Sequence, residues 1–138
     1  MPVTLTRTVG FRAVHRLYRP DWTEAKNREA FGALSEPPGH AHDYRCVVTV
    51  AGPTDPRMRM VLDLSALDRI LQDEVVTRLD GKHLNQDVPG LEGTLPTCEA
   101  LALDVFRRLV PRLPPGVTLE RVRIMEDPTL YADCTGLD

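Results

Sequence analysis

The order of the patterned segments is the feature that most constrains the fold of this chain. Residues 3–15 alternate between apolar and polar side chains, and a β-branched run covers about 42–51, so each segment predicts a strand. Strand patterns return at 117–125 and around 130–134, after two segments with helical periodicity. Hairpin pairs on both sides of two adjacent helices predict an α+β fold with an antiparallel sheet, rather than a doubly wound parallel sheet.

Two segments between the hairpins predict the helices. The first begins at a capping box, Ser65-Ala66-Leu67-Asp68, and carries apolar residues at helical spacing as far as Leu79. The second opens at Pro96-Thr97. Each helix has one apolar face, so we expect both to cover one face of a four-stranded sheet. We also expect a short helix over 25–31 and a short additional strand over 58–64.

Three histidines lie at the ends of predicted strands. His40 and His42 open the second strand, and because alternate residues of a strand face the same side, their imidazoles should point together. His15 ends the first strand on the parity of its apolar residues. A His-x-His pair alone is often only an exposed or hydrogen-bonded pair of strand residues. Three neutral imidazoles and one open position nevertheless describe a catalytic zinc centre, so we predict that these three histidines bind Zn2+.

Composition limits the classes of function. The chain has 138 residues, which predicts one domain over 1–138 and leaves little room for a deep pocket inside one subunit. Its 17 Lys and Arg against 20 Asp and Glu include no basic run, so we expect no nucleic-acid partner. No apolar stretch approaches about 18 residues, and no charged-then-apolar leader opens the sequence, which favours a cytoplasmic protein without a membrane partner. The three widely spaced cysteines predict neither a disulfide framework nor a cysteine zinc site.

Short motifs follow one another along nearly the whole chain: Phe11-Arg-Ala-Val-His15, Pro37-x-Gly-His-x-His-x-Tyr44, Leu79-Asp80, Leu84-Asn85-x-Asp-Val-Pro89, Pro96-Thr-x-Glu99 and Ile124-Met-Glu126. In order and spacing they resemble the 6-pyruvoyl-tetrahydropterin synthase family, which includes the 6-carboxytetrahydropterin synthases. The resemblance implies a tunnelling fold of β-β-α-α-β-β order, in which two helices cover an antiparallel sheet. It also implies a homo-oligomer, a trimer or hexamer, with active sites between subunits and a pterin-like small molecule as substrate.

The resemblance assigns site residues as well. The three histidines match the zinc ligands of the family, and Glu126 matches its pterin anchor. A carboxylate suits that role, because its two oxygens accept two N–H groups from the guanidine-like edge of a pterin. Thr97, Cys98 and Glu99 fall in the segment that helps line the pterin pocket. Glu99 is also a favourable charge in the first turn of a helix, with or without a ligand.

Two departures from the family pattern affect the catalytic residues. The catalytic cysteine of the family lies four or six residues before the first histidine of the pair, where this sequence has Glu36 and Leu34. A histidine directly follows the aspartate of the family, whereas Gly81 follows Asp80 here. Of the thiolate, aspartate and histidine that relay the proton, this chain therefore keeps only Asp80.

Three residues are candidates to replace the missing members of the relay. Glu36 is either a substitute base or a solvated loop residue before Pro37. His83 either shares proton transfer with Asp80 or is a structural histidine at a helix C-terminus, where positive charge is favoured. Cys98 lies near a helix N-terminus, which stabilises a thiolate.

Three functions remain open from the sequence. The first is a zinc-dependent lyase that acts on 7,8-dihydroneopterin triphosphate or a related pterin, by elimination or cleavage in the side chain, with Glu36, Asp80 and His83 as catalytic residues. The second is a zinc enzyme of the same descent that carries out aldol-type cleavage, dehydration or cyclisation on another hydroxy-carbonyl compound of specialised metabolism. The third is a non-catalytic pterin-binding or metal-binding module.

Overall fold

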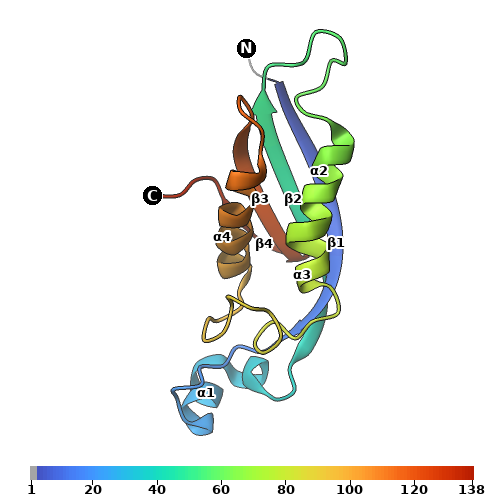
Figure 1. Cartoon of the computed structure of the whole chain (residues 1–138). Helices are drawn as coiled ribbons and strands as arrows, with labels where there is room; N and C mark the ends of the chain where they lie inside the picture. Colours follow the sequence, from blue (N-terminus) through green and yellow to red (C-terminus); the bar gives the residue numbers. More distant parts are fainter. Residues whose placement is uncertain (1–2) are drawn as a thin grey trace.

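A computed structural model describes residues 3–138 and shows one antiparallel sheet with helices on one of its faces (Figure 1). Residues 1–2 of the predicted domain lie outside the described part. The strands are β1 (Val3–His15), β2 (His40–Gly52), β3 (Thr118–Asp127) and β4 (Leu130–Cys134). They lie in the order β1-β2-β3-β4, and each neighbouring pair is antiparallel. This arrangement confirms the predicted α+β fold and its order of elements.

The helical layer consists of two rods. The first runs through α2 and a π-helical turn, η2, into α3, and the second is α4 with a short 3-10 turn, η3, at its end. Their bounds are α2 (Leu64–Leu71), η2 (Gln72–Val76), α3 (Thr77–Leu79), α4 (Cys98–Leu109) and η3 (Val110–Arg112). The carboxylate of Asp63 caps the first rod by accepting a hydrogen bond from the Ala66 amide, so the predicted capping box at Ser65 is wrong. Thr97 caps the second rod.

The predicted short strand over 58–64 is wrong, because these residues belong to an irregular loop and to the start of α2. Asp55 explains the loop: its carboxylate accepts hydrogen bonds from the amides of Arg57 and Met58, each at 2.8 Å. This side chain holds a turn that competes with ladder pairing. Leu62 is the buried residue of the loop.

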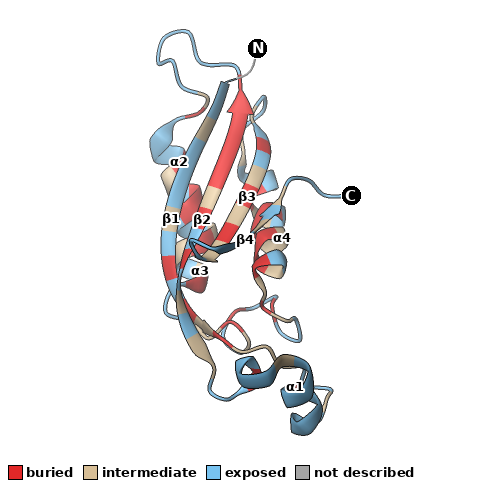
Figure 2. Ribbon diagram, turned by 180° about the vertical axis from the view of Figure 1, so that it is seen from behind, coloured by how far each residue is buried: buried red, intermediate tan, exposed pale blue. Residues whose placement is uncertain are grey.

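The core lies between the sheet and the two rods. Alternate residues of β2 face the helices, and Figure 2 shows the buried stripe along that strand. The apolar stripes of the rods meet it, which is why the helical periodicity could be detected in the sequence. The most deeply buried members are Tyr44, Cys46, Val48 and Val50 from β2, Leu67, Leu71, Val75 and Leu79 from the first rod, and Leu101, Val105 and Leu109 from α4.

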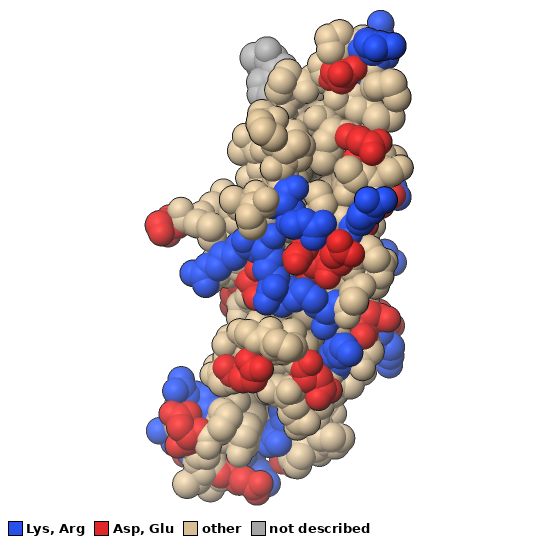
Figure 3. Space-filling view, viewed as in Figure 1, with Lys and Arg blue, Asp and Glu red and all other residues tan. Residues whose placement is uncertain are grey.

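Charged side chains gather in the middle of the outer face of the helical layer (Figure 3). Arg78 of α3 and Asp104 of α4 form an ion pair of 2.9 Å, and Arg112 pairs with Asp73 at 3.2 Å. These pairs link one rod to the other.

The connection between β1 and β2 forms a small helical lobe that extends beyond the end of the sheet (Figure 1). It contains α1 (Glu24–Phe31), close to the predicted helix over 25–31, and a 3-10 turn, η1 (Gly32–Ser35). Asn27 is 1% exposed and closes the lobe, because its side chain accepts from the Arg19 amide and donates to the Arg19 carbonyl. A backbone hydrogen bond from Leu17 to the carbonyl of Leu34 joins the end of the lobe to the chain that leaves β1.

Candidate active site

Three histidines meet where β1 ends and β2 begins. His15 and His40 are register partners in the β1–β2 pair, and His42 lies two residues further along β2 on the same face. The ring centroids are 4.6 Å apart for His15 and His40, 5.1 Å for His15 and His42, and 5.0 Å for His40 and His42. One nitrogen of each ring lies within 4.8 Å of one nitrogen of the other two. The structure thus gathers the three predicted metal ligands into one cluster.

A tight turn places His40 against β1. Gly39 has a φ of 114°, in the region that favours glycine, and a Cβ there would lie 2.6 Å from the carbonyl oxygen of His15. His83 contacts the same turn: its Nε2 lies 2.6 Å from the Pro38 carbonyl, while its Nδ1 accepts from the Asn85 amide at 3.3 Å. This pair of contacts requires the neutral tautomer that carries its proton on Nε2.

The donor set of the cluster fits a divalent metal ion such as zinc. Nδ1 of His15 lies 2.8 Å from the Pro96 carbonyl, and donating its proton there leaves the Nε2 lone pair free for a metal. Nε2 of His42 is buried and has no hydrogen-bond partner among the described residues. Oε2 of Glu126 lies 3.3 Å from that nitrogen, which is short enough for an ion pair but is not aligned as a hydrogen bond. A divalent metal would satisfy such a nitrogen.

Burial favours the neutral form of His15 and His40. His15 is 3% exposed, and desolvation is the main cause that lowers its pKa below the usual 6.5, against the opposing hydrogen bond to Pro96. The pKa of His40 is also lowered, by desolvation first and then by the neighbouring His42. Neutral imidazole is the form that binds a metal, so the lowered pKa values of His15 and His40 favour metal binding at neutral pH.

Glu126 and Cys98 lie beside the cluster. Glu126 is near the end of β3, and its Oε1 accepts a hydrogen bond from the thiol of Cys98, with 3.6 Å between sulfur and oxygen. Burial raises the pKa of the Cys98 thiol to about 12, and the charge of Glu126 adds to the shift. The thiol therefore stays protonated near neutral pH and acts as a hydrogen-bond donor rather than as a thiolate base.

Tyr44 lies against the same group of residues. Its ring stacks on Phe11 at 4.9 Å between centroids and lies 5.5 Å from the ring of His42. Tyr44 is 1% exposed, and its hydroxyl has no hydrogen-bond partner within residues 3–138. Desolvation, followed by the charge of Glu126, raises the pKa of the hydroxyl far above its usual value. Tyr44 is therefore a neutral donor next to the candidate site.

A cavity of about 230 Å³ lies between the histidine cluster and the predicted substrate-binding residues. The sheet contributes His15, His40 and Glu126 to its wall, and the start of α4 contributes Thr97, Cys98 and Glu99. The remaining wall is apolar and consists of Leu17, Leu34 and Leu130. The structure thus brings together all four residues that the sequence assigned to substrate binding.

Some residues of the site were not predicted from the sequence. Leu17 and Leu130 were not assigned to a site, because a leucine in a loop or at a strand end has no chemical signature. Pro96 contributes only its carbonyl oxygen, and any residue could supply one. No signal short of the fold could have identified these three.

The three predicted catalytic residues lie away from the wall of this cavity. Glu36 forms an exposed ion pair of 3.1 Å with Arg28. Asp80 accepts a hydrogen bond from the Arg12 amide at 2.8 Å and lines a separate hollow of about 340 Å³. His83 contacts the Pro38 carbonyl, as described above. In the described part of a single chain the three do not line the cavity, and their catalytic roles stay predictions.

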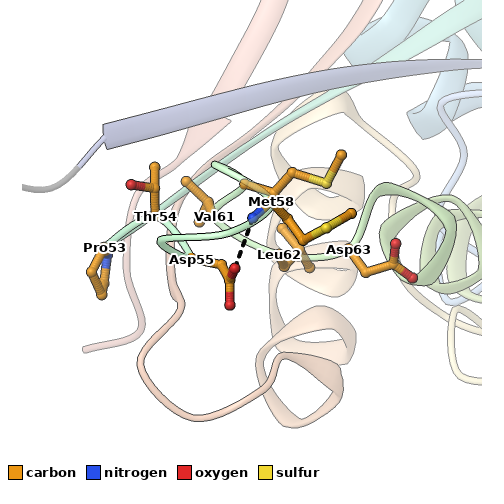
Figure 4. A pocket seen from close by; sticks show the side chains of 8 residues that line it. Pro53, Thr54, Asp55, Met58, Val61, Leu62 and Asp63 are labelled. Atoms are coloured by element: carbon orange, nitrogen blue, oxygen red, sulfur yellow. Dashed lines mark hydrogen bonds between the residues drawn. The ribbon is translucent and has the colours of Figure 1, made fainter.

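Another hollow, of about 410 Å³, lies at the far end of the sheet (Figure 4). It is formed by the loop that follows β2, and its wall includes Met58, Met60 and Leu62 together with the carboxylates of Asp55 and Asp63. It has neither a histidine nor a cysteine in its wall, so it shares no chemistry with the cluster. Within residues 3–138, no helix is both long and apolar enough to cross a membrane.

The sheet, the helical layer and the histidine cluster together define a class: an α+β protein in which three histidines that could hold a metal ion lie beside a cavity. Comparisons with known proteins identify the family. The profile described as 6-pyruvoyl tetrahydropterin synthase matches residues 4–136. The 6-pyruvoyl tetrahydrobiopterin synthase of Pongo abelii is 37% identical over 122 residues, which cover 88% of this chain and 83% of the relative. The enzyme of that name from Drosophila melanogaster is 37% identical over 124 residues, 90% of this chain and 74% of the relative.

A solved structure agrees with the sequence relatives. The 6-pyruvoyl tetrahydropterin synthase of Caenorhabditis elegans superposes with a TM-score of 0.90 and 31% identity, covering 99% of this chain and 97% of the other. The chain therefore belongs to the 6-pyruvoyl tetrahydropterin synthase family and is a lyase of that family. The resemblance inferred from the motifs and the tunnelling fold that it implies are both confirmed.

Proposed function

We propose that this protein is a zinc-dependent lyase that acts on the side chain of a pterin such as 7,8-dihydroneopterin triphosphate. One observation carries the proposal: three imidazoles have nitrogens within 4.8 Å of one another, and two of them, His15 and His40, line a cavity together with Glu126. The three imidazoles suit zinc, and the carboxylate suits the guanidine-like edge of a pterin. The relatives, named as 6-pyruvoyl tetrahydrobiopterin synthases, support this choice of substrate.

The cavity residues would bind and orient the substrate. Glu126 would accept two N–H groups from the flat ring and so fix its position relative to the histidines. Zinc, held by the three histidines, would supply a Lewis acid beside the side-chain oxygens of the substrate. Leu17 and Leu34 would exclude water from one side of the cavity, which strengthens the electrostatic contacts inside it.

A neighbouring subunit would complete the site. The cavity measures about 230 Å³ in one chain, whereas pockets for drug-sized ligands usually measure about 300–1,000 Å³. Glu36 and Asp80 are exposed, so in an assembly either can face the cavity of another copy. We therefore propose a homo-oligomer, a trimer or hexamer, in which the proton-transfer residue comes from the adjacent subunit.

Leu34 favours a second candidate function. It lies on the cavity wall, at one of the two positions where the family carries its catalytic cysteine, and a leucine cannot accept a proton. Gly81 likewise stands in place of the relay histidine. A zinc enzyme that cleaves, dehydrates or cyclises another hydroxy-carbonyl compound would keep the metal cluster and Glu126 while losing this relay.

The deciding experiment incubates the zinc-loaded protein with 7,8-dihydroneopterin triphosphate and measures release of free triphosphate, from elimination, and of glycolaldehyde triphosphate, from cleavage of the side chain. Release of either product supports the first proposal. Pterin binding without turnover leaves the second candidate or a binding module. Absence of pterin binding contradicts both the substrate and the role of Glu126.

Two variants divide the roles within the site. His40→Ala should lose zinc and activity together, because it removes a ligand. Glu126→Ala should keep its zinc but bind pterin more than about tenfold more weakly, because charge-assisted hydrogen bonds are lost. Zinc content by atomic absorption and pterin affinity by fluorescence measure the two effects. Equal loss of metal in both variants would contradict this division.

A further inference from the structure

The carboxylate of Glu126 has two different neighbours, one at each oxygen. Oε1 accepts the hydrogen bond from the Cys98 thiol, and Oε2 lies 3.3 Å from Nε2 of His42 without the alignment of a hydrogen bond. The hydroxyl of Tyr44 has no hydrogen-bond partner in the described part of the chain. Among residues 3–138, Cys98 is therefore the one side chain that donates a hydrogen bond to this carboxylate.

We propose that Cys98 is a positioning residue for Glu126: its thiol fixes the plane of the carboxylate so that both oxygens can receive the guanidine-like edge of a ligand. The inference rests on the proposed function, because it assumes that Glu126 is the anchor of a pterin. Cys98 acts through Glu126 and takes no part in a covalent step.

The backbone around Cys98 makes it a fixed support. Cys98 is the first residue of α4, directly after Thr97, whose hydroxyl caps the helix by accepting from the Ala100 amide at 3.1 Å. Its side chain is 3% exposed, so the sulfur cannot turn out to solvent. A glutamate has three rotatable side-chain bonds, and a hydrogen bond from a rigid helix start removes much of that freedom before a ligand arrives.

His42 cannot perform this task when the site is loaded. Its Nε2 is the nitrogen that a metal would take, and a nitrogen whose lone pair binds a metal has no proton to donate to Oε2. The hydrogen bond from Cys98 to Oε1 is then the contact that orients Glu126.

The thiol suits this position because it orients the carboxylate without saturating it. Each carboxylate oxygen offers two lone-pair sites, so Oε1 can accept from Cys98 and from a ligand N–H together. The raised pKa of the thiol keeps its proton in place, and an S–H group is a weak donor that leaves Oε1 able to bind the ligand strongly.

Two substitutions separate the hydrogen bond from packing. Cys98→Ala removes the donor and some volume, whereas Cys98→Val removes the donor and fills the space. We expect each to weaken the binding of neopterin to the zinc-loaded full-length protein by about three- to tenfold, measured by pterin fluorescence. Cys134→Ala is the matched control, because its thiol donates to the Gly136 carbonyl and does not line the cavity, so its affinity should equal that of the wild type. Zinc content should be unchanged in all three.

A double-mutant cycle with Glu126→Ala, which removes the acceptor of the thiol, completes the test. If Cys98 acts through the carboxylate, Cys98→Ala should change neopterin affinity by less than about twofold in the Glu126→Ala background. Wild-type affinity in Cys98→Val, or a loss that persists in the Glu126→Ala background, overturns the positioning role. Failure of the wild type itself to bind neopterin overturns the proposed function instead, so the two failures are distinguishable.

Discussion

At the scale of single residues, His15 is the member of the cluster most constrained by its surroundings. Its Nδ1 is tied to the Pro96 carbonyl, its backbone carbonyl contacts the turn at Gly39, and its ring lies edge-on to His40. A ligand held in one tautomer and one orientation loses little entropy when a metal binds. The burial of His15 also affects stability, because desolvation disfavours the protonated form of its imidazole.

The metal-free protein should lose stability as the pH falls below about 6.5. The pKa values of His15 and His40 are lowered in the folded state relative to 6.5, so just below 6.5 the unfolded chain binds more protons than the folded chain. Stability is therefore complete above 6.5 and decreases through the window between 6.5 and the lower folded-state pKa values. Urea midpoints of chelator-treated protein between about pH 8 and pH 5 measure it. His40→Gln should reduce the slope, and a midpoint that rises towards acid would refute the assignment.

His83→Ala should weaken zinc binding by about three- to tenfold. Its imidazole holds the Pro38 carbonyl two residues before His40, so removing it loosens the turn that presents the ligand. Zinc affinity by chelator competition measures the effect, with Lys82→Ala as a control at the adjacent position. If turnover disappears while zinc affinity is unchanged, His83 belongs to the proton relay, the catalytic role predicted from the sequence, rather than to the turn.

At the scale of elements, the turn before β2 decides whether the cluster forms. Gly39 and Gly81 both have positive φ, of 114° and 74°. A Cβ at residue 39 would meet the His15 carbonyl at 2.6 Å, whereas one at residue 81 would meet nothing within 4 Å. The two positions therefore separate backbone strain from steric clash.

Gly39→Ala should destabilise the protein by about 1–3 kcal/mol more than Gly81→Ala, because only the first adds a clash with the backbone to the cost of a left-handed conformation. It should also weaken zinc binding, since it moves His40 away from His15. Urea denaturation and zinc titration of both variants check this. Equal destabilisation by the two substitutions would show that the close approach at residue 39 relaxes easily.

The elements differed in how far the sequence could predict them. The alternation of apolar and polar residues over 3–15 and around 130–134 predicted β1 and β4 closely. Such alternation arises when the two faces of a strand have different surroundings. The segment 58–64 has apolar residues too, but Asp55 holds a turn there instead of a strand. The histidine cluster could be predicted because His15 ends one predicted strand, while His40 and His42 lie two residues apart at the start of the next. The contact between His15 and Pro96 could not, because it joins residues 81 apart in the sequence.

At the scale of the whole molecule, the sheet has two edge strands and the cavity is small. β1 and β4 are the outer strands of the described sheet, and exposed apolar side chains occur on both, including Val3 and Leu130. Within residues 3–138, the end of β1 gains a further partner through a bridge between Val14 and His83. Exposed strand edges of this length are usually paired or covered, which supports an assembly of several copies.

The mass of the protein in solution should be three or six times 15.4 kDa. Pairing of β1 of one copy with β4 of the next would close the sheet edges, as closed symmetry requires. Sedimentation equilibrium of the zinc-loaded protein measures it. A monomer at micromolar concentration would leave the cavity without the neighbour that the proposed function requires.

Mixing two inactive variants tests whether active sites lie between subunits. His40→Ala lacks the metal cluster and Asp80→Asn lacks the proposed relay residue, so each alone should be inactive. When the two are dissociated and reassembled together, some sites combine the intact cluster of an Asp80→Asn subunit with Asp80 of a His40→Ala subunit. Those sites should recover activity, up to about a quarter of the wild-type level for random mixing of two subunits per site. Because Asp80 lies away from the cavity of its own chain, absence of recovery would mean that it serves the fold through the Arg12 amide rather than the chemistry.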